Sequence, residues 1–347
     1  MNPSRLILKS GPTFEGFSPS WQRGDFFGEV VFTTGMTGYV ESLTDPSFAG
    51  QILVFTFPLI GNYGVPEPSF WESKKIQVSG VIVAELCTHP SHFQSRCSLL
   101  QWLQEQKIPL MTAVDTRALT IHLRTKGTAL GVITPSREQM PAFVEESAVH
   151  FVSSVSCKEP ILYGKGKKRV IAVDCGMKEN IMRHLLQFPI EVKRVPYDYD
   201  YTNEDYDGIF ISNGPGDPMQ NKETIAVLQK AMRKTKPIFG ICLGAQMLAL
   251  SIGARTYKLH FGHRGHNQPC IDTKTKKCYL TSQNHGYAVD EGSLPGGWEV
   301  SWRNLNDQTI EGIAHKDLPF FAVQFHPEAA PGPTDSVGLF KTFYQML

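Results

Sequence analysis

Short apolar runs alternate with amphipathic segments through the second half of the chain, from Arg169 onward. Apolar residues spaced three or four positions apart, such as Ile225, Leu228 and Met232, indicate helices, and short unbroken apolar runs indicate buried strands. Strands are expected at 169–174, 191–196, 207–212, 237–241, 278–283 and 319–325, and helices at 178–188, 223–234 and 242–253. Because alternating strands and helices form sheets covered on both faces, this half predicts an α/β domain with a mostly parallel sheet flanked by helices. In such sheets the functional residues gather at the carboxyl ends of the strands.

The first part of the chain has a different pattern, with runs of Val, Thr and Phe bounded by glycine. Strands are expected at 28–39, 50–57 and 79–86, and helices at 92–106 and 115–127. Asp115 is a suitable first residue for the second helix and Gly127 a suitable last one. The periodicity is then weak up to a basic run that ends near Lys168. We therefore predict an N-terminal β-rich α/β domain over 1–134, a linker over 135–168 and a second domain over 169–347.

Composition limits the classes of protein to consider. The 347 residues carry 34 Lys and Arg against 33 Asp and Glu. Such a balance argues against binding to nucleic acid or to a membrane surface by charge. Seven cysteines without a CxxC pair, and a start without a signal-peptide core, favour a reducing compartment, so we expect a cytoplasmic protein. The apolar stretch 238–254 is shorter than the roughly 20 residues of a membrane-spanning helix and is interrupted by Gln246 and glycines.

The sharpest chemical signal is the pentapeptide Gly240-Ile241-Cys242-Leu243-Gly244, which joins an expected strand to an expected helix. Glycines on both sides of a nucleophile allow a tight turn that presents its side chain above the sheet. The N-terminus of the following helix favours a thiolate, and the N–H of Leu243 is a natural oxyanion donor. The alternative is a structural cysteine that packs as a small hydrophobic residue. The two flanking glycines argue against that alternative, but the motif by itself leaves both interpretations open.

A base for this thiolate is offered by His326-Pro327-Glu328, which follows an expected strand. In an extended chain residues i and i+2 point to the same side, so the carboxylate of Glu328 can hold the imidazole of His326. The other ring nitrogen is then able to face Cys242. An isolated histidine would more often be structural, but the glutamate two residues later favours the catalytic interpretation.

Two loops that follow expected strands are weaker candidates. The turn 213–218 contains Gly214 and Gly216, whose backbone approaches a ligand easily and suits a second oxyanion donor. The segment 283–287 offers amide and backbone partners. By composition alone, an ordinary tight turn is the better explanation of the first loop.

Three histidines three residues apart, His260, His263 and His266, suggest a metal site at first sight. A glycine-rich turn is a poor ligand cage, and no carboxylate or cysteine lies at ligand spacing nearby in the sequence. We therefore expect no metal site. The chain also lacks both the G-x-x-x-x-G-K-[ST] loop and the G-x-G-x-x-G fingerprint, so it shows no nucleotide site of its own.

The motifs GICLGAQ, SNGPGDP and VQFHPE together resemble those of the class I glutamine amidotransferases, whose glutaminase domain uses a Cys-His-Glu triad. The first domain distinguishes among these enzymes. Its segments 28–52, 57–64 and 114–120, and also 261–269 in the second domain, are similar to the small chain of carbamoyl-phosphate synthase. The resemblance covers nearly the whole chain apart from the linker region.

The resemblance implies a glutaminase in which Cys242 attacks the side-chain amide of L-glutamine to form a thioester and release ammonia. His326 would act as base and acid, and Glu328 would orient it. The family's glutamine-binding positions fall on Ser47, Gly214, Gly216, Leu243, Gln246, Asn284, Gly286 and Tyr287. Among them, Gly214 and Leu243 would supply the oxyanion N–H groups, and Ser47 would reach the substrate from the first domain.

The resemblance also implies a partner. In this family ammonia passes through an interior tunnel to a large subunit, which combines it with bicarbonate and ATP to make carbamoyl phosphate for pyrimidine and arginine biosynthesis. ATP and Mg would thus be used by the large subunit, with no cofactor in this chain. Because the chain ends at Leu347 with no ATP-binding domain following it, we expect a separate large subunit in a heterodimer that can assemble further, although a fused polypeptide cut at this point would look the same.

Two residues depart from the common pattern of the family. Ala245 stands where histidine is frequent, and Tyr287 stands where phenylalanine is common. Neither belongs to the triad, but Ala245 removes a polar group beside Gln246 and is expected to affect substrate affinity or coupling. Two alternatives remain at this point: a non-catalytic scaffold for the large subunit, and a glutaminase that feeds another synthetase.

Overall fold

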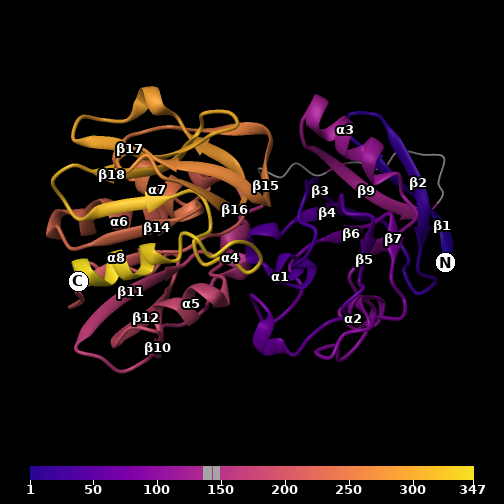
Figure 1. Cartoon of the computed structure of the whole chain (residues 1–347), viewed down its shortest axis with the longest axis horizontal. Helices are drawn as coiled ribbons and strands as arrows, with labels where there is room; N and C mark the ends of the chain where they lie inside the picture. The colour runs from indigo at the N-terminus through magenta and orange to yellow at the C-terminus, as the bar shows by residue number, and fades with distance from the viewer. Residues whose placement is uncertain (136–142, 144–148) are drawn as a thin grey trace. The chain divides into compact units, whose positions relative to one another are not determined.

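The chain forms two compact units, Met1–Val149 and His150–Leu347. A computed structural model describes residues 1–135, 143 and 149–347 (Figure 1). The division falls within the predicted linker 135–168. From His150 onward that segment belongs to the second unit, where it forms helix α4 (Phe151–Val155) and strand β10 (Ile161–Tyr163). The remaining part of the predicted linker, 136–142 and 144–148, lies outside the described residues.

The first unit contains a mixed seven-stranded sheet with the strand order β2-β1-β9-β3-β4-β6-β8. Its strands are β1 (Asn2–Leu8), β2 (Thr13–Ser18), β3 (Phe26–Thr33), β4 (Gln51–Phe55), β6 (Gly80–Ile82), β8 (Leu110–Met111) and β9 (Ala129–Pro135). The neighbours β3, β4, β6 and β8 run parallel, and β1, β2 and β9 join antiparallel. A separate parallel pair is formed by β5 (Leu59–Ile60) and β7 (Glu85–Leu86). The β-rich first domain is as expected.

The helices of the first unit are α1 (Tyr39–Thr44), α2 (Leu99–Glu105) and α3 (Thr116–Lys126). Helix α3 matches its prediction: the carboxylate of Asp115 accepts from the N–H of Ala118 at 2.8 Å, and Gly127 ends the helix with φ 93°. The helix predicted at 92–106 was too long. It begins only at Leu99, because Cys97 pairs with Val65 in a β-bridge and the hydroxyl of Ser98 then caps the helix.

The second unit contains a ten-stranded sheet with the order β10-β12-β11-β13-β14-β19-β18-β17-β15-β16. Its strands after β10 are β11 (Lys168–Asp174), β12 (Ile190–Pro196), β13 (Gly208–Ile211), β14 (Ile238–Ile241), β15 (Thr256–Asp272), β16 (Cys278–Val289), β17 (Trp298–Asn304), β18 (Ile310–His315) and β19 (Phe320–Val323). The centre, from β12 to β19, is parallel as predicted. The predicted parallel character does not extend to β15–β18 or to β10, which are antiparallel.

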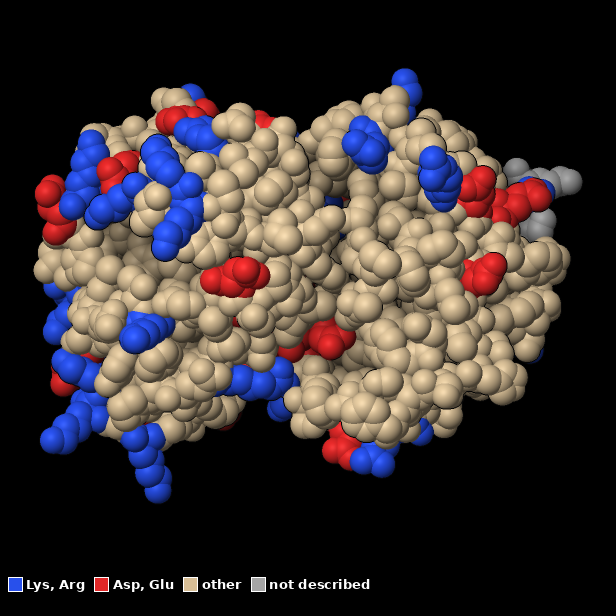
Figure 2. Space-filling view, in the orientation of Figure 1, with Lys and Arg blue, Asp and Glu red and all other residues tan. Residues whose placement is uncertain are grey.

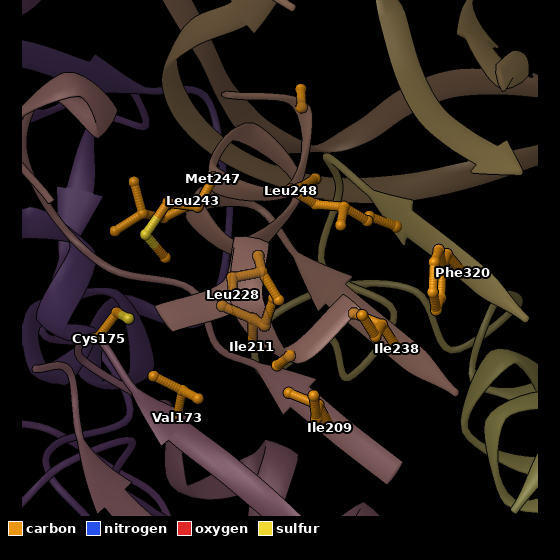
Figure 3. Packing of buried hydrophobic residues seen from close by; sticks show 14 of the residues in the cluster. Val173, Cys175, Ile209, Ile211, Leu228, Ile238, Leu243, Met247, Leu248 and Phe320 are labelled. Carbon is orange, nitrogen blue, oxygen red and sulfur yellow. The ribbon is translucent and has the colours of Figure 1, made fainter. Parts of the chain in front are cut away.

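Helices cover both faces of this parallel centre. They are α5 (Glu179–Leu185), α6 (Lys222–Ala231), α7 (Leu243–Ser251) and α8 (Gly338–Met346). Alternate strand residues point to opposite faces: Ile171 and Val173 pack with α6 and α7, while Val170 and Ala172 pack with α5 and α8. Figure 3 shows Val173 in the first of these clusters, with Leu228 of α6 and Leu243 of α7. The result is a three-layer α/β/α core whose strand ends carry the polar loops.

Basic and acidic side chains both appear on the visible face of each unit (Figure 2), in keeping with the net charge of +1. Among the described residues no helix is long and apolar enough to cross a membrane.

Candidate active site

Cys242 occupies a strained turn between β14 and α7. Its backbone has φ 54° and ψ −105°, a positive-φ conformation that a non-glycine residue rarely adopts. The flanking glycines are sterically required: a Cβ on Gly240 would lie 2.8 Å from the carbonyl of Gly244, and a Cβ on Gly244 would lie 2.3 Å from the carbonyl oxygen of Ile211. The predicted elbow is therefore present, with Cys242 2% exposed.

His326 and Glu328 follow strand β19 and are buried together. The Nδ1 of His326 lies 2.6 Å from a carboxylate oxygen of Glu328. Because a carboxylate only accepts, this contact places the proton on Nδ1 and leaves Nε2 for another partner. The N–H of Cys242 donates to the carbonyl of Val323 at 2.8 Å, which joins the elbow to the strand that carries the histidine.

Electrostatics favour a charged imidazole at this position. Burial alone would lower the pKa of His326, but Glu328 and the nearby Cys242 outweigh it and raise the pKa to about 10. An imidazole that is stabilised in its charged form beside a sulfur is suited to form a thiolate–imidazolium pair.

A buried lysine completes the charge network around Glu328. The side chain of Lys178 is 2% exposed, and its Nζ lies 3.1 Å from the carboxylate of Glu328 and donates to the carbonyl of Ala329. Burial alone would raise the pKa of Glu328, but Lys178 and His326 outweigh it and lower the pKa to about 2. The amide of Asn180 also donates to the carbonyl of Glu328. Lys178 and His326 thus keep the side chain of Glu328 ionised.

The two candidate oxyanion donors, Leu243 and Gly214, lie on segments that pack against each other. Leu243 is the first residue of α7, so its N–H has no acceptor within the helix. The loop after β13 passes close by, because a Cβ on Gly214 would lie 2.8 Å from the side chain of Leu243 and 2.0 Å from the carbonyl oxygen of Cys175. Gly216 has φ 85°, a conformation that favours glycine. The thiol of Cys242 points to the carbonyl of Asn284, with 3.6 Å between sulfur and oxygen.

Comparison with known proteins agrees with both units. Residues 171–346 match the family model "Glutamine amidotransferase class-I", and residues 6–133 match "Carbamoyl-phosphate synthase small chain, CPSase domain". The arginine-specific small chain of carbamoyl phosphate synthase from Aspergillus oryzae is 46% identical over 355 residues, which cover 97% of this chain and 79% of that protein. The corresponding protein of Schizosaccharomyces pombe is 46% identical, with 97% and 86% covered. The chain belongs to the carbamoyl-phosphate synthase small-chain family.

Some relatives of this family are much longer than this chain. The multifunctional protein CAD of Squalus acanthias is 48% identical over 98% of the chain, but the chain spans only 16% of its length. For the multifunctional protein URA2 of Saccharomyces cerevisiae the identity is 44%, and the chain spans 17% of that protein. In the family the small-chain sequence thus occurs both in proteins of similar length and inside larger ones.

Most of the predicted glutamine-binding positions gather around the elbow in the second unit. The amide of Gln246 on α7 donates to the carbonyl of Tyr287 at 2.9 Å and to the side chain of Gln324 at 3.1 Å. Asn284, Gly286 and Tyr287 lie on β16, with Asn284 beside the sulfur of Cys242. Their role in binding glutamine stays a prediction.

Ser47 belongs to the first unit, whereas the other predicted positions belong to the second. It lies in the short 3-10 helix Pro46–Phe48, and its N–H donates to the carboxylate of Asp45 at 2.9 Å. The predicted reach of Ser47 toward the substrate therefore stays a prediction.

The unusual Ala245 is 3% exposed in an apolar cluster between α7 and the sheet. A methyl group suits that environment without a polar partner.

Two residues that contact Glu328 were not predicted from the sequence. Lys178 and Asn180 were only part of an expected amphipathic helix, and their contact with Glu328 spans about 150 residues of chain. No local motif marks them. Of the three histidines considered for a metal, His260 is exposed and His266 half-buried, whereas His263 is buried beside His285 and Glu311.

Proposed function

We propose that this chain is the glutamine-hydrolysing component of a carbamoyl-phosphate synthase, with Cys242 as nucleophile. The observation that carries the proposal is the elbow at Cys242, held beside a buried His326–Glu328 pair in a class I amidotransferase unit. The N-terminal unit supports the specific synthase, because its family model is that of the small chain.

The first step forms a thioester. The Cys242 thiolate attacks the side-chain carbonyl carbon of L-glutamine, and the resulting oxyanion accepts from the N–H groups of Leu243 and Gly214. The imidazolium of His326 gives its proton to the leaving nitrogen, so that ammonia departs and an acyl–sulfur bond remains.

The second step regenerates the enzyme. Neutral His326 takes a proton from water, and the hydroxide attacks the thioester through a second oxyanion in the same hole. Glutamate leaves and the Cys242 thiolate returns beside the imidazolium. Glu328, ionised next to Lys178, keeps the proton on Nδ1 of the imidazole throughout.

The ammonia would be the substrate of a synthetase active site outside the described residues. We propose a large carbamoyl-phosphate synthase subunit as recipient, in a cytoplasmic heterodimer that can assemble further or within one longer polypeptide. ATP and Mg would act on that partner, and the product would enter pyrimidine or arginine biosynthesis. The relatives support both arrangements, since they include separate small chains and long multifunctional proteins.

The test is glutamine-dependent ammonia release by the chain, alone and with an added large subunit, for the unchanged chain and for Cys242→Ser. We expect stimulation by the large subunit, and complete loss of glutamine-dependent synthesis in Cys242→Ser while synthesis from free ammonia persists. Loss of both activities would make Cys242 structural. No glutaminase activity with the partner present would indicate a scaffold, and activity indifferent to the partner would indicate another synthetase.

A further inference from the structure

Two histidines and a glutamate meet inside the antiparallel part of the second unit. His263 lies on β15, His285 on β16 and Glu311 on β18, and all three are buried. One ligand atom from each lies within 4.8 Å of the others. The separations from a carboxylate oxygen of Glu311 are 3.4 Å to Nδ1 of His263 and 3.8 Å to Nε2 of His285.

The hydrogen bonds of His285 leave a lone pair pointing into this cluster. Its Nδ1 lies 2.8 Å from the carbonyl oxygen of Tyr287, which only accepts, so Nδ1 carries the proton. Its Nε2 faces the side-chain oxygen of Gln283 at 3.2 Å and the carboxylate of Glu311. The amide nitrogen of Gln283 is engaged by Cys270 and Thr281, which keeps the oxygen toward the histidine. A neutral imidazole thus meets acceptors at both nitrogens.

His263 is arranged in the same way. Its Nε2 lies 2.8 Å from a carboxylate oxygen of Asp307 and therefore donates to it. Its Nδ1 is buried and makes no hydrogen bond to the described residues, and the same holds for the second carboxylate oxygen of Glu311. Two ring nitrogens and a carboxylate converge, and a proton or a cation between them is needed to offset their mutual repulsion.

We propose that this cluster binds one divalent zinc ion through Nδ1 of His263, Nε2 of His285 and the carboxylate of Glu311. Imidazole and carboxylate ligands suit zinc, which binds them at about 2.0–2.2 Å in a tetrahedral arrangement. The side-chain oxygen of Gln283 lies 3.2 Å from Nε2 of His285 and is the candidate fourth ligand.

The hydrogen bonds to the proposed ligands also match those of a zinc site. Histidines that bind metals generally donate their second N–H to a carboxylate or a backbone carbonyl, which orients the ring. His263 does so to Asp307 and His285 to Tyr287. The amide of Asn304 donates to Glu311 at 3.2 Å and holds the third ligand. Two neutral imidazoles, Glu311 and the adjacent Asp307 together balance the two charges of the ion.

A metal bound here would fix strand β16, which carries predicted glutamine-binding positions. His285 lies between Asn284 and Gly286, two predicted glutamine-binding positions on β16. The zinc proposal does not rest on the proposed glutaminase reaction, because it is argued from the cluster alone and its test measures metal.

The test measures zinc in the full chain, purified without a histidine tag and without chelators. We expect about one zinc per chain by mass spectrometry of the metals, as for a site with a closed ligand set. The content should fall to background in Glu311→Gln and in His263→Asn, and stay unchanged in His260→Asn, which alters an exposed histidine of the same strand. Zinc retained in full by Glu311→Gln would overturn the assignment.

A second measurement on the unchanged chain covers the case in which these variants do not fold. After removal of zinc, Co²⁺ should bind one per chain, give the intense visible bands of tetrahedral cobalt, and shift two exchangeable imidazole N–H resonances strongly. Those two protons are the ones donated to Asp307 and Tyr287. No zinc in the purified chain and no stoichiometric Co²⁺ uptake would show that a shared proton, not a metal, stabilises the cluster.

Discussion

The two sides of the candidate active site are held in place by different forces. Cys242 is positioned by its backbone, because Gly240 and Gly244 leave room for a strained turn that no larger residues would allow. His326 is positioned by charge, because Glu328 and, behind it, Lys178 form a buried network. The glycines that permit a tight turn lie next to it in the sequence, whereas the partner of a buried charge can lie anywhere in the chain. Substitutions of the glycines should therefore disturb the turn at Cys242, and substitutions of the charged residues should disturb the position of His326.

The largest effect is expected from Lys178→Met, which removes one charge from the buried network. The carboxylate of Glu328 loses its lysine partner and keeps only His326, and breaking a buried pair in this way costs about 3–5 kcal/mol. The thermal transition and the urea midpoint should both fall markedly. The matched control is Lys230→Met, because the Lys230–Asp200 pair is exposed and its loss should change stability little. Equal effects of the two substitutions would contradict the charge network.

The pH dependence of stability tests the same side. Since the pKa of Glu328 is lowered from 4.5 to about 2, its contribution is present above pH 4.5 and is lost as the pH falls toward 2. The contribution is about 3 kcal/mol for a shift of this size. Unfolding free energies of the unchanged chain and of Glu328→Gln, measured from pH 6 to pH 3, should converge as the pH falls. A difference that stays constant over this range would show that Glu328 is not held as a carboxylate.

The backbone side is tested by Gly244→Ala. The added Cβ would lie 2.3 Å from the carbonyl oxygen of Ile211, so the elbow has to shift, at a cost of about 1–3 kcal/mol. Gly338→Ala is the control, because a Cβ there meets nothing within 4 Å. We expect reduced stability and reduced glutamine-dependent ammonia release only in Gly244→Ala. Unchanged activity in that variant would mean that the elbow geometry is not required.

The smallest effect concerns the cap of helix α3 in the first unit. Asp115→Ala removes the acceptor for the N–H of Ala118 and should cost about 1 kcal/mol, while Asp115→Asn should cost little. Thermal unfolding of the three chains measures the difference. Equal midpoints for all three would show that the cap contributes nothing to this unit.

The same contrast explains how much was predictable. The parallel strands from β11 to β14, the elbow, the His326–Glu328 contact and the limits of α3 all follow from residues close together in sequence, and they are present. The start of α2 was missed because Cys97 is held by a bridge to Val65, a residue 32 positions earlier. The cluster of His263 with His285 and Glu311 was missed for the same reason, since its members come from three strands.

Selective labelling by a glutamine-like electrophile tests the central claim, that Cys242 is the nucleophile of a glutaminase. The chain contains its own control, because Cys278 is exposed whereas Cys242 is 2% exposed. With a γ-glutamyl diazoketone, peptide mass spectrometry should find one adduct per chain, on Cys242, and L-glutamine should protect it. Iodoacetamide should instead label Cys278 first. Labelling by the glutamine analogue that follows exposure, with Cys278 modified and Cys242 spared, would contradict the account.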